Sequence, residues 1–564
     1  MSQIYEFAEP LEYVLRWEKE RPAETYLTQP LKDGSVESFT WGDTVDQARR
    51  GAAYLKSLDL PEGSNIALIG KNSAHWIIAD LAIWMAGHVP VPLYPTLGAD
   101  ACAYVLEHCE AKLLVVGRLD GITDSWNELA PVLPQDLPLL TLPQAPAVRE
   151  ENSVDWAQIQ QSFEPLQDIV LRGRDALATI IYTSGTTGKP KGVMHNFSSM
   201  TAPAGCSVNL WQPSNDDRML SYLPLAHVAE RVAVEIPSLI FGFQLFFNES
   251  LETFPADLKR ARPTRFFSVP RLWTKFYQAV NAKIPPSKQR ILFAIPFLGK
   301  KVKKKILQEL GLDSVKVGLT GAAPLSAEII SWYRKLGLEL LEVFGMTENC
   351  AASHAARSGE VRPGYVGTPL DGVQCRIDSN GEVLVKSPGQ MMGYYKMPEE
   401  TAANLTEDGF FRTGDRGELD EKGRLRITGR TKDLFKTSKG KYIAPVPIEN
   451  MLGAHPGIEV ICATGPGQPQ PFALAVLSPG LLDPSSAEDK TRFEREFSEH
   501  LDEINQQLED HERLNYVVIV KEPWTIESGL LTPTMKLKRN EIEARYLQFA
   551  EKWRDRNQKI IWEG

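Results

Sequence analysis

Residues 182–193 read Tyr-Thr-Ser-Gly-Thr-Thr-Gly-Lys-Pro-Lys-Gly-Val and follow a short apolar run, residues 178–181, that is typical of a buried strand. Glycines allow backbone N–H groups to approach a phosphate closely, hydroxyls add hydrogen-bond donors, and lysines add positive charge. The stretch therefore predicts a loop that binds a polyphosphate. The residues expected to contribute are Thr183, Ser184, Gly185, Thr186, Thr187, Gly188, Lys189 and Lys191.

The spacing of this loop differs from that of a P-loop. A P-loop has four residues between its glycines and a Ser or Thr directly after its lysine, whereas here two residues separate Gly185 from Gly188 and Pro190 follows Lys189. A proline at this place also disfavours a helix that could present its N-terminus to the phosphates. Over twelve consecutive residues the segment resembles the signature of the adenylate-forming (AMP-binding) superfamily, which contains acyl-CoA synthetases, firefly luciferase and peptide-synthetase adenylation domains. The plain alternative is a polar surface turn.

Length and composition limit the class of protein. A chain of 564 residues is longer than the usual chain that folds around a single hydrophobic core, so at least two domains are expected. The net charge of −10 offers no broad positive field, which argues against nucleic acid as a partner. The six cysteines show no metal-binding spacing and are expected to be reduced. Without a signal peptide or a membrane-spanning window, we expect a cytoplasmic protein whose membrane contact is peripheral, at the inner face.

The order of sequence patterns predicts the fold. From residue 40 helical and strand-like periods alternate, which favours a parallel sheet with helices on both faces. Residues 120–168 show little periodicity and are expected to form a surface excursion. Beyond residue 364 short strands with Gly and Asp turns follow, and the segment from residue 431 is more charged. The predicted fold class is α/β: an N-terminal domain of α/β layers with a small β-rich subdomain, residues 1–430, followed by a small mobile α+β domain, residues 431–564.

Two later strands each lead into a loop, which is where open parallel sheets bind their ligands. The loops read Thr-Gly-Ala-Ala-Pro (320–324) and Glu-Val-Phe-Gly-Met-Thr-Glu (342–348). In the first the backbone can approach an adenine edge because no bulky side chain intervenes, and in the second an aromatic ring can stack on the base. The residues expected at the adenine are Gly321, Ala322, Ala323, Phe344 and Gly345.

The same region offers a candidate metal ligand. Glu348 is a hard carboxylate beside the expected phosphates, and carboxylates of this kind suit Mg²⁺. Thr347 is its neighbour in the chain, and Thr186 or Thr187 is expected across the site. A lone Glu is more often a surface charge, so the prediction depends on the surrounding motif.

The resemblance extends in order over nearly the whole chain and implies roles for further residues. His227, in Tyr-Leu-Pro-Leu-Ala-His-Val-Ala-Glu-Arg (222–231), would lie near the carboxylate substrate and the reacting phosphate. Asp415, which ends Asp-Gly-Phe-Phe-Arg-Thr-Gly-Asp, would accept hydrogen bonds from both ribose hydroxyls. Arg430 would reach ribose or phosphate. Without the family, His227 would more often be a core histidine.

Three residues beyond the predicted domain boundary complete the implied site. Lys432 matches the pivot of the family's hinge, and Gly440 lies in the loop that lines the pantetheine tunnel of coenzyme A (CoA) in the thioester-forming stage. Lys536, in Leu-Thr-Pro-Thr-Met-Lys-Leu-Lys-Arg (531–539), aligns with the catalytic lysine, with Arg539 as the motif arginine. Met535 stands where the family usually has glycine.

A cluster of five lysines, Gly-Lys-Lys-Val-Lys-Lys-Lys (299–305), follows an apolar segment. It is compatible with docking on anionic lipid and equally with a solvated helix face.

The resemblance implies an ATP-dependent fatty-acid–CoA ligase, with catalytic residues Lys536, His227 and Glu348, that acts on medium- to long-chain acids and uses Mg²⁺. Its partners would be the fatty acid, ATP and CoA, and a homodimer is left open. Three alternatives remain: a fatty-acyl-AMP ligase, an aryl-acid or luciferase-type enzyme, and an inactive nucleotide-binding scaffold.

Overall fold

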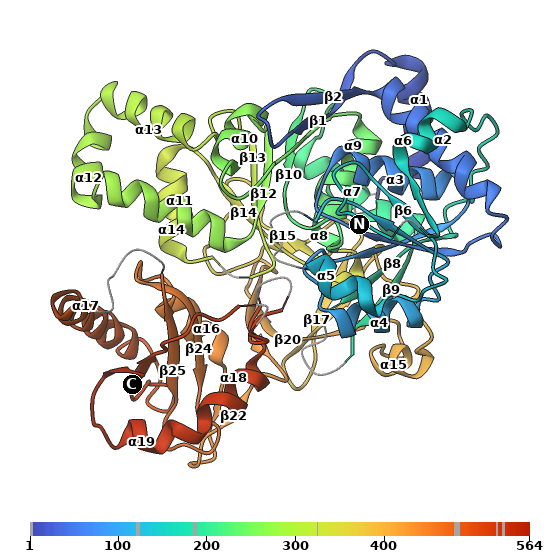
Figure 1. Ribbon diagram of the computed structural model, residues 1–564. Helices are drawn as coiled ribbons and strands as arrows, with labels where there is room; N and C mark the ends of the chain where they lie inside the picture. Colours follow the sequence, from blue (N-terminus) through green and yellow to red (C-terminus); the bar gives the residue numbers. More distant parts are fainter. Residues whose placement is uncertain are drawn as a thin grey trace.

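A computed structural model shows a large N-terminal domain and a smaller C-terminal domain, drawn in orange and red in Figure 1. Among the described helices, none is both long and apolar enough to cross a bilayer. The structure describes residues 4–119, 125–149, 151–183, 189–323, 325–478, 486–525, 528–532 and 536–563.

The first sheet of the N-terminal domain is entirely parallel, with strand order β4-β3-β5-β6-β7. Helices α2 (Trp41–Ser57) and α3 (Ala74–Met85) pack against each other in the same core. Residues 120–168 are not only a surface excursion, because they supply β6 and β7; these strands have three residues each, too short for a period to show in the sequence. The strands are β3 (Asn65–Ile69), β4 (Val89–Leu93), β5 (Leu113–Val116), β6 (Leu139–Thr141) and β7 (Ser153–Asp155).

A second sheet carries the two loops expected at the adenine. Strands β12 (Arg265–Ser268), β13 (Val317–Thr320) and β14 (Leu340–Phe344) are parallel, and β15 (His354–Ala355) and β16 (Thr368–Pro369) continue the sheet antiparallel. The carboxyl ends of β13 and β14 therefore meet at one edge, which is where ligands of open parallel sheets bind.

The predicted phosphate loop connects two strands of an antiparallel hairpin. Strand β8 (Leu177–Thr183) ends at the loop, and β9 (Lys191–Asn196) begins after it. Strand β19 (Gly393–Tyr394) pairs with the other edge of β9. Residues Ser184, Gly185, Thr186, Thr187 and Gly188 lie outside the described residues.

A helical segment follows His227 without interruption. It consists of α8 (Val228–Glu230), one π-helical turn η2 (Arg231–Glu235) and α9 (Ile236–Phe241), and then leads into β11 (Gln244–Phe247). β11 lies in a sheet of order β10-β11-β1-β2, with β10 (Arg218–Ser221), β1 (Thr25–Pro30) and β2 (Val36–Thr40).

The β-rich part is a four-stranded antiparallel sheet of order β17-β18-β20-β21. Its strands are β17 (Gln374–Ile377), β18 (Glu382–Lys386), β20 (Phe411–Leu419) and β21 (Leu425–Arg430). β21 ends directly before the predicted hinge.

The C-terminal domain is a sheet of order β24-β25-β26-β27 with helices packed against it. Its elements confirm the predicted α+β character, although the last strand was not expected from the sequence. Together with the N-terminal layers they confirm the predicted α/β fold class. The elements are α16 (Pro445–Leu452), β24 (Ile458–Thr464), β25 (Phe472–Leu477), α17 (Ala487–Asn505), β26 (Val517–Ile519), α18 (Arg539–Tyr546) and β27 (Ile560–Trp562).

Candidate active site

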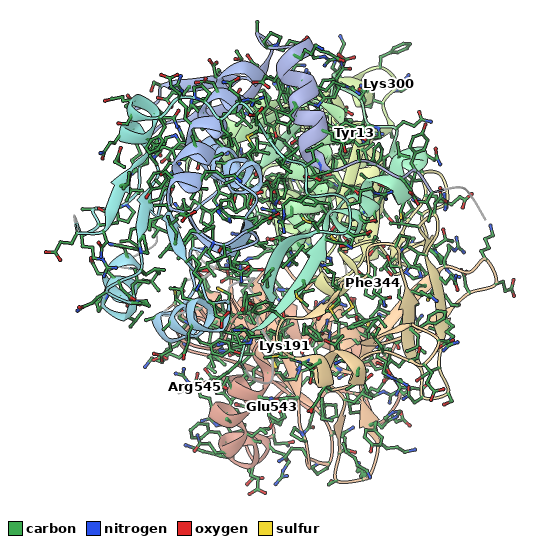
Figure 2. The ribbon with its side chains drawn as sticks, turned by 90° about the vertical axis from the view of Figure 1, so that its right-hand side faces the viewer. Tyr13, Lys191, Lys300, Phe344, Glu543 and Arg545 are labelled. Atoms are coloured by element: carbon green, nitrogen blue, oxygen red, sulfur yellow. The ribbon has the colours of Figure 1, made fainter. Side chains whose placement is uncertain are left out.

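The two described lysines beside the phosphate loop differ in their surroundings. Lys191, at the start of β9, forms an ion pair with Glu400, and its Nζ lies 5.1 Å from the ring centroid of Tyr394. Figure 2 shows Lys191 at the lower edge of the N-terminal domain, toward the C-terminal domain. The Nζ of Lys189 lies 4.8 Å from the ring centroid of Tyr104 and forms no ion pair with a described acidic residue. Lys189 is therefore the better placed of the two to offer its charge to a phosphate.

The backbone after β13 and β14 is tightly constrained. A Cβ on Gly321 would lie 2.8 Å from Val343 Cγ2, and one on Gly345 would lie 2.5 Å from the backbone of Ala351, so only glycine fits at either position. Ala322 has φ of +66°, the left-handed region that residues other than glycine rarely adopt. Phe344 ends β14 and is half-buried. The backbone of residues 321–323 and the aromatic ring of Phe344 therefore lie at the same edge of the sheet.

Glu348, the expected Mg²⁺ ligand, is held by two residues that the sequence did not single out. Tyr394 donates its hydroxyl hydrogen to Glu348 Oε1 at 2.9 Å, and burial raises the pKa of Tyr394, so the hydroxyl stays a donor. His195 Nε2 donates to the carbonyl of Thr347 at 2.8 Å. Burial lowers the pKa of His195 to about 4, so this ring is neutral at physiological pH. In the sequence, Tyr394 was marked only by the glycine before it, and His195 only by its position four residues after Lys191.

The donor set around Glu348 fits a hard cation. In the described part of the chain, Glu348 Oε2 has no hydrogen-bond partner, so a carboxylate oxygen is left for a ligand. Carboxylate and hydroxyl oxygens are what Mg²⁺ prefers. The second expected ligand, Thr186, lies outside the described residues.

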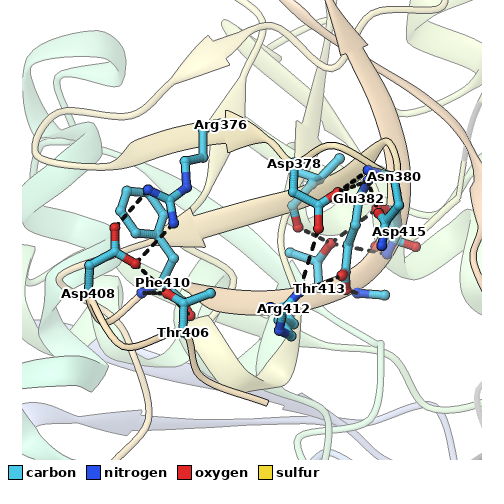
Figure 3. Close-up of polar contacts among 12 residues, drawn as sticks. Arg376, Asp378, Asn380, Glu382, Thr406, Asp408, Phe410, Arg412, Thr413 and Asp415 are labelled. Atoms are coloured by element: carbon cyan, nitrogen blue, oxygen red, sulfur yellow. Dashed lines mark hydrogen bonds and ion pairs between the residues drawn. The ribbon is translucent and has the colours of Figure 1, made fainter. Parts of the chain in front are cut away.

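Asp415 and Arg430 face each other across neighbouring strands. They are cross-strand partners on β20 and β21, and Arg430 Nε lies 3.0 Å from Asp415 Oδ1. The Asp415 N–H donates to Thr413 Oγ1 at 3.1 Å, and Glu382 accepts from the Gly414 N–H at 3.0 Å; Figure 3 shows this network around Asp415. Burial raises the pKa of Asp415, while Arg430 opposes that shift. The carboxylate is fixed in position before any ligand binds.

Lys536 comes from the C-terminal domain but lies among residues of the N-terminal domain. Its own N–H donates to Thr532 Oγ1 at 3.0 Å, and its carbonyl accepts from the Thr532 N–H at 2.8 Å, so Thr532 holds the backbone that carries the side chain. Met535 lies outside the described residues. The side chain stays accessible to solvent, yet the protein around it desolvates the ammonium and lowers its pKa; Arg430 lowers it further, and Asp415 and Glu348 oppose the shift.

His227 caps the helical segment that follows it. Its Nδ1 accepts the N–H of Ala229 at 3.1 Å, so in the neutral ring Nε2 carries the hydrogen. Although part of the ring is accessible, desolvation lowers the pKa of His227 to about 3, and the charge of Lys536 adds to this effect. His227 is therefore a neutral hydrogen-bond donor within electrostatic range of Lys536.

The predicted hinge and CoA loop each lie in a turn between strands. Lys432 is exposed in a turn directly after β21, where the Asp433 N–H donates to Arg430 O at 3.2 Å. Gly440 has φ of +79° in the turn between β22 (Phe435–Lys436) and β23 (Tyr442–Ile443), which is hydrogen-bonded to the C-terminal domain through Ser438. Arg539 pairs with Glu449 Oε1 at 2.8 Å inside the C-terminal domain, so its role is structural in this conformation.

The structure thus brings together Glu348, Asp415, Arg430, Lys536 and His227 where two domains meet, and Tyr394, which contacts both Glu348 and Lys191, connects this cluster to the start of β9. Fold and site together are typical of a two-domain nucleotide-binding enzyme. The chain belongs to the AMP-binding enzyme family: the family's model matches residues 14–395, and the model of the AMP-binding enzyme C-terminal domain matches residues 432–556.

Curated relatives and solved structures agree with this family. Long-chain-fatty-acid–CoA ligase 5 of Mus musculus is 30% identical over 560 residues, covering 88% of this chain and 82% of that protein. Long-chain-fatty-acid–CoA ligase FadD15 of Mycobacterium bovis is 29% identical and covers 95% of both chains. The A domain of a carboxylic acid reductase from Segniliparus rugosus, solved with AMP and a carboxylic acid, has a TM-score of 0.79 at 22% identity over 97% of this chain and 94% of that one. At that identity the likeness shows the fold alone.

Proposed function

We propose that this protein is an ATP-dependent fatty-acid–CoA ligase that activates a medium- to long-chain carboxylate as an acyl-adenylate and then transfers the acyl group to CoA. The observation that carries the proposal is the position of Lys536, a C-terminal residue that interacts electrostatically with Glu348, Asp415 and Arg430 and lies close enough to His227 to lower its pKa. The names of the relatives, long-chain-fatty-acid–CoA ligases at about 30% identity, support the acyl substrate.

In the first half-reaction a carboxylate oxygen of the acid attacks the α-phosphorus of ATP, and the bond to pyrophosphate breaks. The substrate supplies its own nucleophile, so the protein's work is positioning and charge stabilisation. Lys536 would bridge the carboxylate and the α-phosphate, and His227 Nε2–H would donate to an oxygen there. Asp415 would accept from the ribose hydroxyls.

Residues on the other side of the site would hold the leaving group. Thr183 and Lys189, with the loop between them, would bind the β- and γ-phosphates, and Phe344 would stack on the adenine that the backbone of residues 321–323 approaches. Glu348, with Thr186, would hold Mg²⁺, which supplies charge neutralisation at the phosphates when bound.

In the second half-reaction the CoA sulfur attacks the acyl carbon, AMP leaves, and the thiol proton is released. We propose a domain boundary after residue 430, with rotation about Lys432 that withdraws Lys536 and brings the Gly440 loop toward the pantetheine. The exposed turn that contains Lys432 supports a pivot at this residue, and Gly440 lies in a turn of its own between β22 and β23. A homodimer adds nothing that this site requires.

Pyrophosphate exchange and thioester formation, measured over a panel of acids, test the proposal. We expect exchange that depends on a medium- or long-chain acid and on Mg²⁺, and acyl-CoA only when CoA is present. Exchange without thioester formation would assign a fatty-acyl-AMP ligase instead. Preference for aromatic acids would assign an aryl-acid or luciferase-type enzyme, and no exchange with any acid would assign an inactive scaffold.

We further propose a peripheral location at the inner face of a membrane. Fatty acids partition into bilayers, and the lysine cluster at residues 299–305 offers local positive charge on an otherwise acidic chain.

A further inference from the structure

One helical hairpin of the N-terminal domain concentrates positive charge. Between Asp257 and Glu309 the chain has 14 Lys and Arg residues and no Asp or Glu, although its net charge is −10. The hairpin consists of α12 (Pro286–Ala294) and α13 (Leu298–Glu309), which pack against each other at the periphery of the domain (Figure 1). This segment is the strongest local departure from the charge of the chain.

The basic residues of the hairpin lack the close acidic partners found earlier in the segment. Five basic residues before α12 form ion pairs with acidic side chains, such as Arg265 with Asp217 at 2.6 Å. By contrast, no described acidic side chain forms an ion pair with the basic residues of the hairpin itself. These residues are Lys288, Arg290, Lys300, Lys301, Lys303, Lys304 and Lys305.

The turn of the hairpin exposes large apolar side chains next to these lysines. Phe297 is 84% exposed and Ile291 67%, and Ile295 and Leu298 are also exposed. A Cβ on Gly299 would lie 2.6 Å from the carbonyl oxygen of Phe293, so the turn is tight. Phe297 itself has φ of +63°, a conformation that favours Gly or Asn. Exposure of a bulky ring in a strained backbone conformation does not stabilise the folded monomer.

Lysines share one exposed face with this apolar tip. Lys300, Lys301, Lys304 and Lys305 are all exposed, while Ile306 is buried against the domain. Figure 2 shows Lys300 projecting from the upper edge of the molecule. Apolar side chains beside clustered lysines are the pattern by which peripheral proteins enter the headgroup region of an anionic bilayer.

We propose that the tip of the α12–α13 hairpin docks on an anionic phospholipid surface, with Phe297 and its apolar neighbours entering the boundary of headgroups and acyl chains and the lysines contacting lipid phosphates. This docking rests on the proposed function, because it would help the enzyme to collect a fatty acid from the membrane. An anionic surface repels a chain of net charge −10, so binding requires such a local patch. An acidic protein partner would pair with the lysines, but it would not explain why Phe297 is exposed.

The charge half of the proposal is tested by changing the five lysines of residues 300–305 to Gln. Each lysine strengthens partitioning to an anionic surface by up to roughly fivefold at low salt, so we expect loss of all five to weaken binding to vesicles of phosphatidylserine and phosphatidylcholine by up to about 3,000-fold. Binding of the wild type should fall in the same way at high salt and on pure phosphatidylcholine. The matched control changes five dispersed exposed lysines to Gln, which alters the net charge equally: Lys19, Lys335, Lys422, Lys521 and Lys552.

The apolar half is tested by Phe297→Gln, with Leu251→Gln as its control because Leu251 is 86% exposed elsewhere on the domain. We expect Phe297→Gln to weaken vesicle binding about tenfold at any salt concentration and Leu251→Gln to leave it unchanged. Thermal unfolding of every variant checks that it is folded.

Several results would overturn the docking surface. The first such result is equal vesicle binding by the five-lysine variant and by its control variant. Binding of the wild type to polyglutamate but not to anionic vesicles would assign the patch to an acidic protein. Loss of a dimer in sedimentation velocity, with vesicle binding unchanged, would assign it to a second copy of the chain. Thioester formation from octanoate without lipid is measured in parallel, and its absence would contradict the proposed function while leaving the vesicle result intact.

Discussion

Two charge clusters of the molecule combine arginine with carboxylates in opposite ways. In the first, Arg231 of the π-helical turn η2 pairs with Asp80 of α3 at 2.8 Å and with Glu235 at 3.0 Å, and all three side chains are 0% exposed. Trp76 and Trp84 cover the guanidinium, with ring centroids 5.3 and 5.5 Å from its carbon. This cluster lies entirely within the N-terminal domain and is sealed.

The second cluster is open and is shared between domains. Asp415 and Arg430 belong to the β-rich part, whereas Lys536 belongs to the C-terminal domain and stays accessible to solvent. Asp415 and Arg430 lie on paired strands, whereas the backbone of Lys536 is held by its hydrogen bonds to Thr532.

The difference teaches which charges hold the fold and which are available for chemistry. Burial raises the pKa values of both Glu235 and Asp80, and the positive charge of Arg231 opposes both shifts, so the carboxyl groups and the cation depend on one another. A sealed cluster cannot be taken apart without leaving a buried charge. In the proposed rotation the open cluster would lose Lys536 at little cost, because water would replace the lost contacts.

The largest expected effect is on the sealed cluster. Arg231→Met leaves Asp80 and Glu235 buried without their cation, and we expect it to lower the free energy of unfolding by about 3 to 5 kcal/mol, measured by urea denaturation. The control is Arg545→Met, which removes an exposed ion pair with Glu522 and should cost about 0 to 1 kcal/mol. Equal losses in both variants would contradict the assignment of stability to the sealed cluster.

The corresponding change in the open cluster should affect rate rather than stability. We expect Lys536→Ala to slow pyrophosphate exchange roughly 10²- to 10³-fold, or about 3 to 4 kcal/mol, because one preorganised contact to the transition state is lost. Thioester formation from supplied acyl-adenylate and the urea midpoint should stay unchanged. Lys538→Ala is the control, and a simultaneous fall of both half-reactions would show that the role assigned to Lys536 is wrong.

Separation of the two domains is tested at the hinge. Lys432→Pro fixes φ and is expected to hold the conformation in which Lys536 lies in the site, so acyl-AMP forms but passes to CoA about tenfold or more slowly. Single-turnover measurement of acyl-AMP and acyl-CoA distinguishes the steps. Lys432→Ala should behave like wild type, and normal thioester synthesis by the proline variant would argue against rotation at this residue.

A smaller effect is expected from the support of Glu348. Tyr394→Phe removes the hydroxyl that donates to Glu348 Oε1 and keeps the ring. A hydrogen bond to a charged group contributes roughly 1.5 kcal/mol or more, which is about tenfold in affinity. We therefore expect the variant to need about tenfold more Mg²⁺ for half-maximal pyrophosphate exchange. The KM for the fatty acid should not change; a shift in that value instead would place Tyr394 in the acyl pocket.

The smallest effect concerns pH. Desolvation, with the help of Arg430, lowers the pKa of Lys536, and the proposed role requires the charged form, so activity should fall as pH rises through that lowered pKa. His227, with a pKa of about 3, should add no loss between pH 5 and 8. In Arg430→Gln the alkaline limb of pyrophosphate exchange should move to higher pH. An unmoved limb would mean that another group is responsible.

Several parts of the fold were readable from the sequence and others were not. Strands β3 and β5, of five and four residues, were predicted from short continuous apolar runs, whereas β6 and β7, with three residues each, give no period to detect. His195 lies on β9 and contacts Thr347 through that residue's carbonyl oxygen, a contact that no sequence pattern encodes.

The sequence by itself determined the Gly-, Thr- and Lys-rich composition of the predicted phosphate loop, the glycines at the ends of β13 and β14, and the identity of the ionisable residues, because those features depend on local backbone freedom and side-chain chemistry. Tertiary structure alone decided that Lys536 lies beside Asp415, that Tyr394 holds Glu348, and that Arg231 is sealed among tryptophans. These pairs are distant in the chain, and their proximity results from how the sheets and the two domains pack. The pKa shifts that make His227 neutral and lower the pKa of Lys536 arise from the same packing, since desolvation is a property of the folded environment and not of the residue.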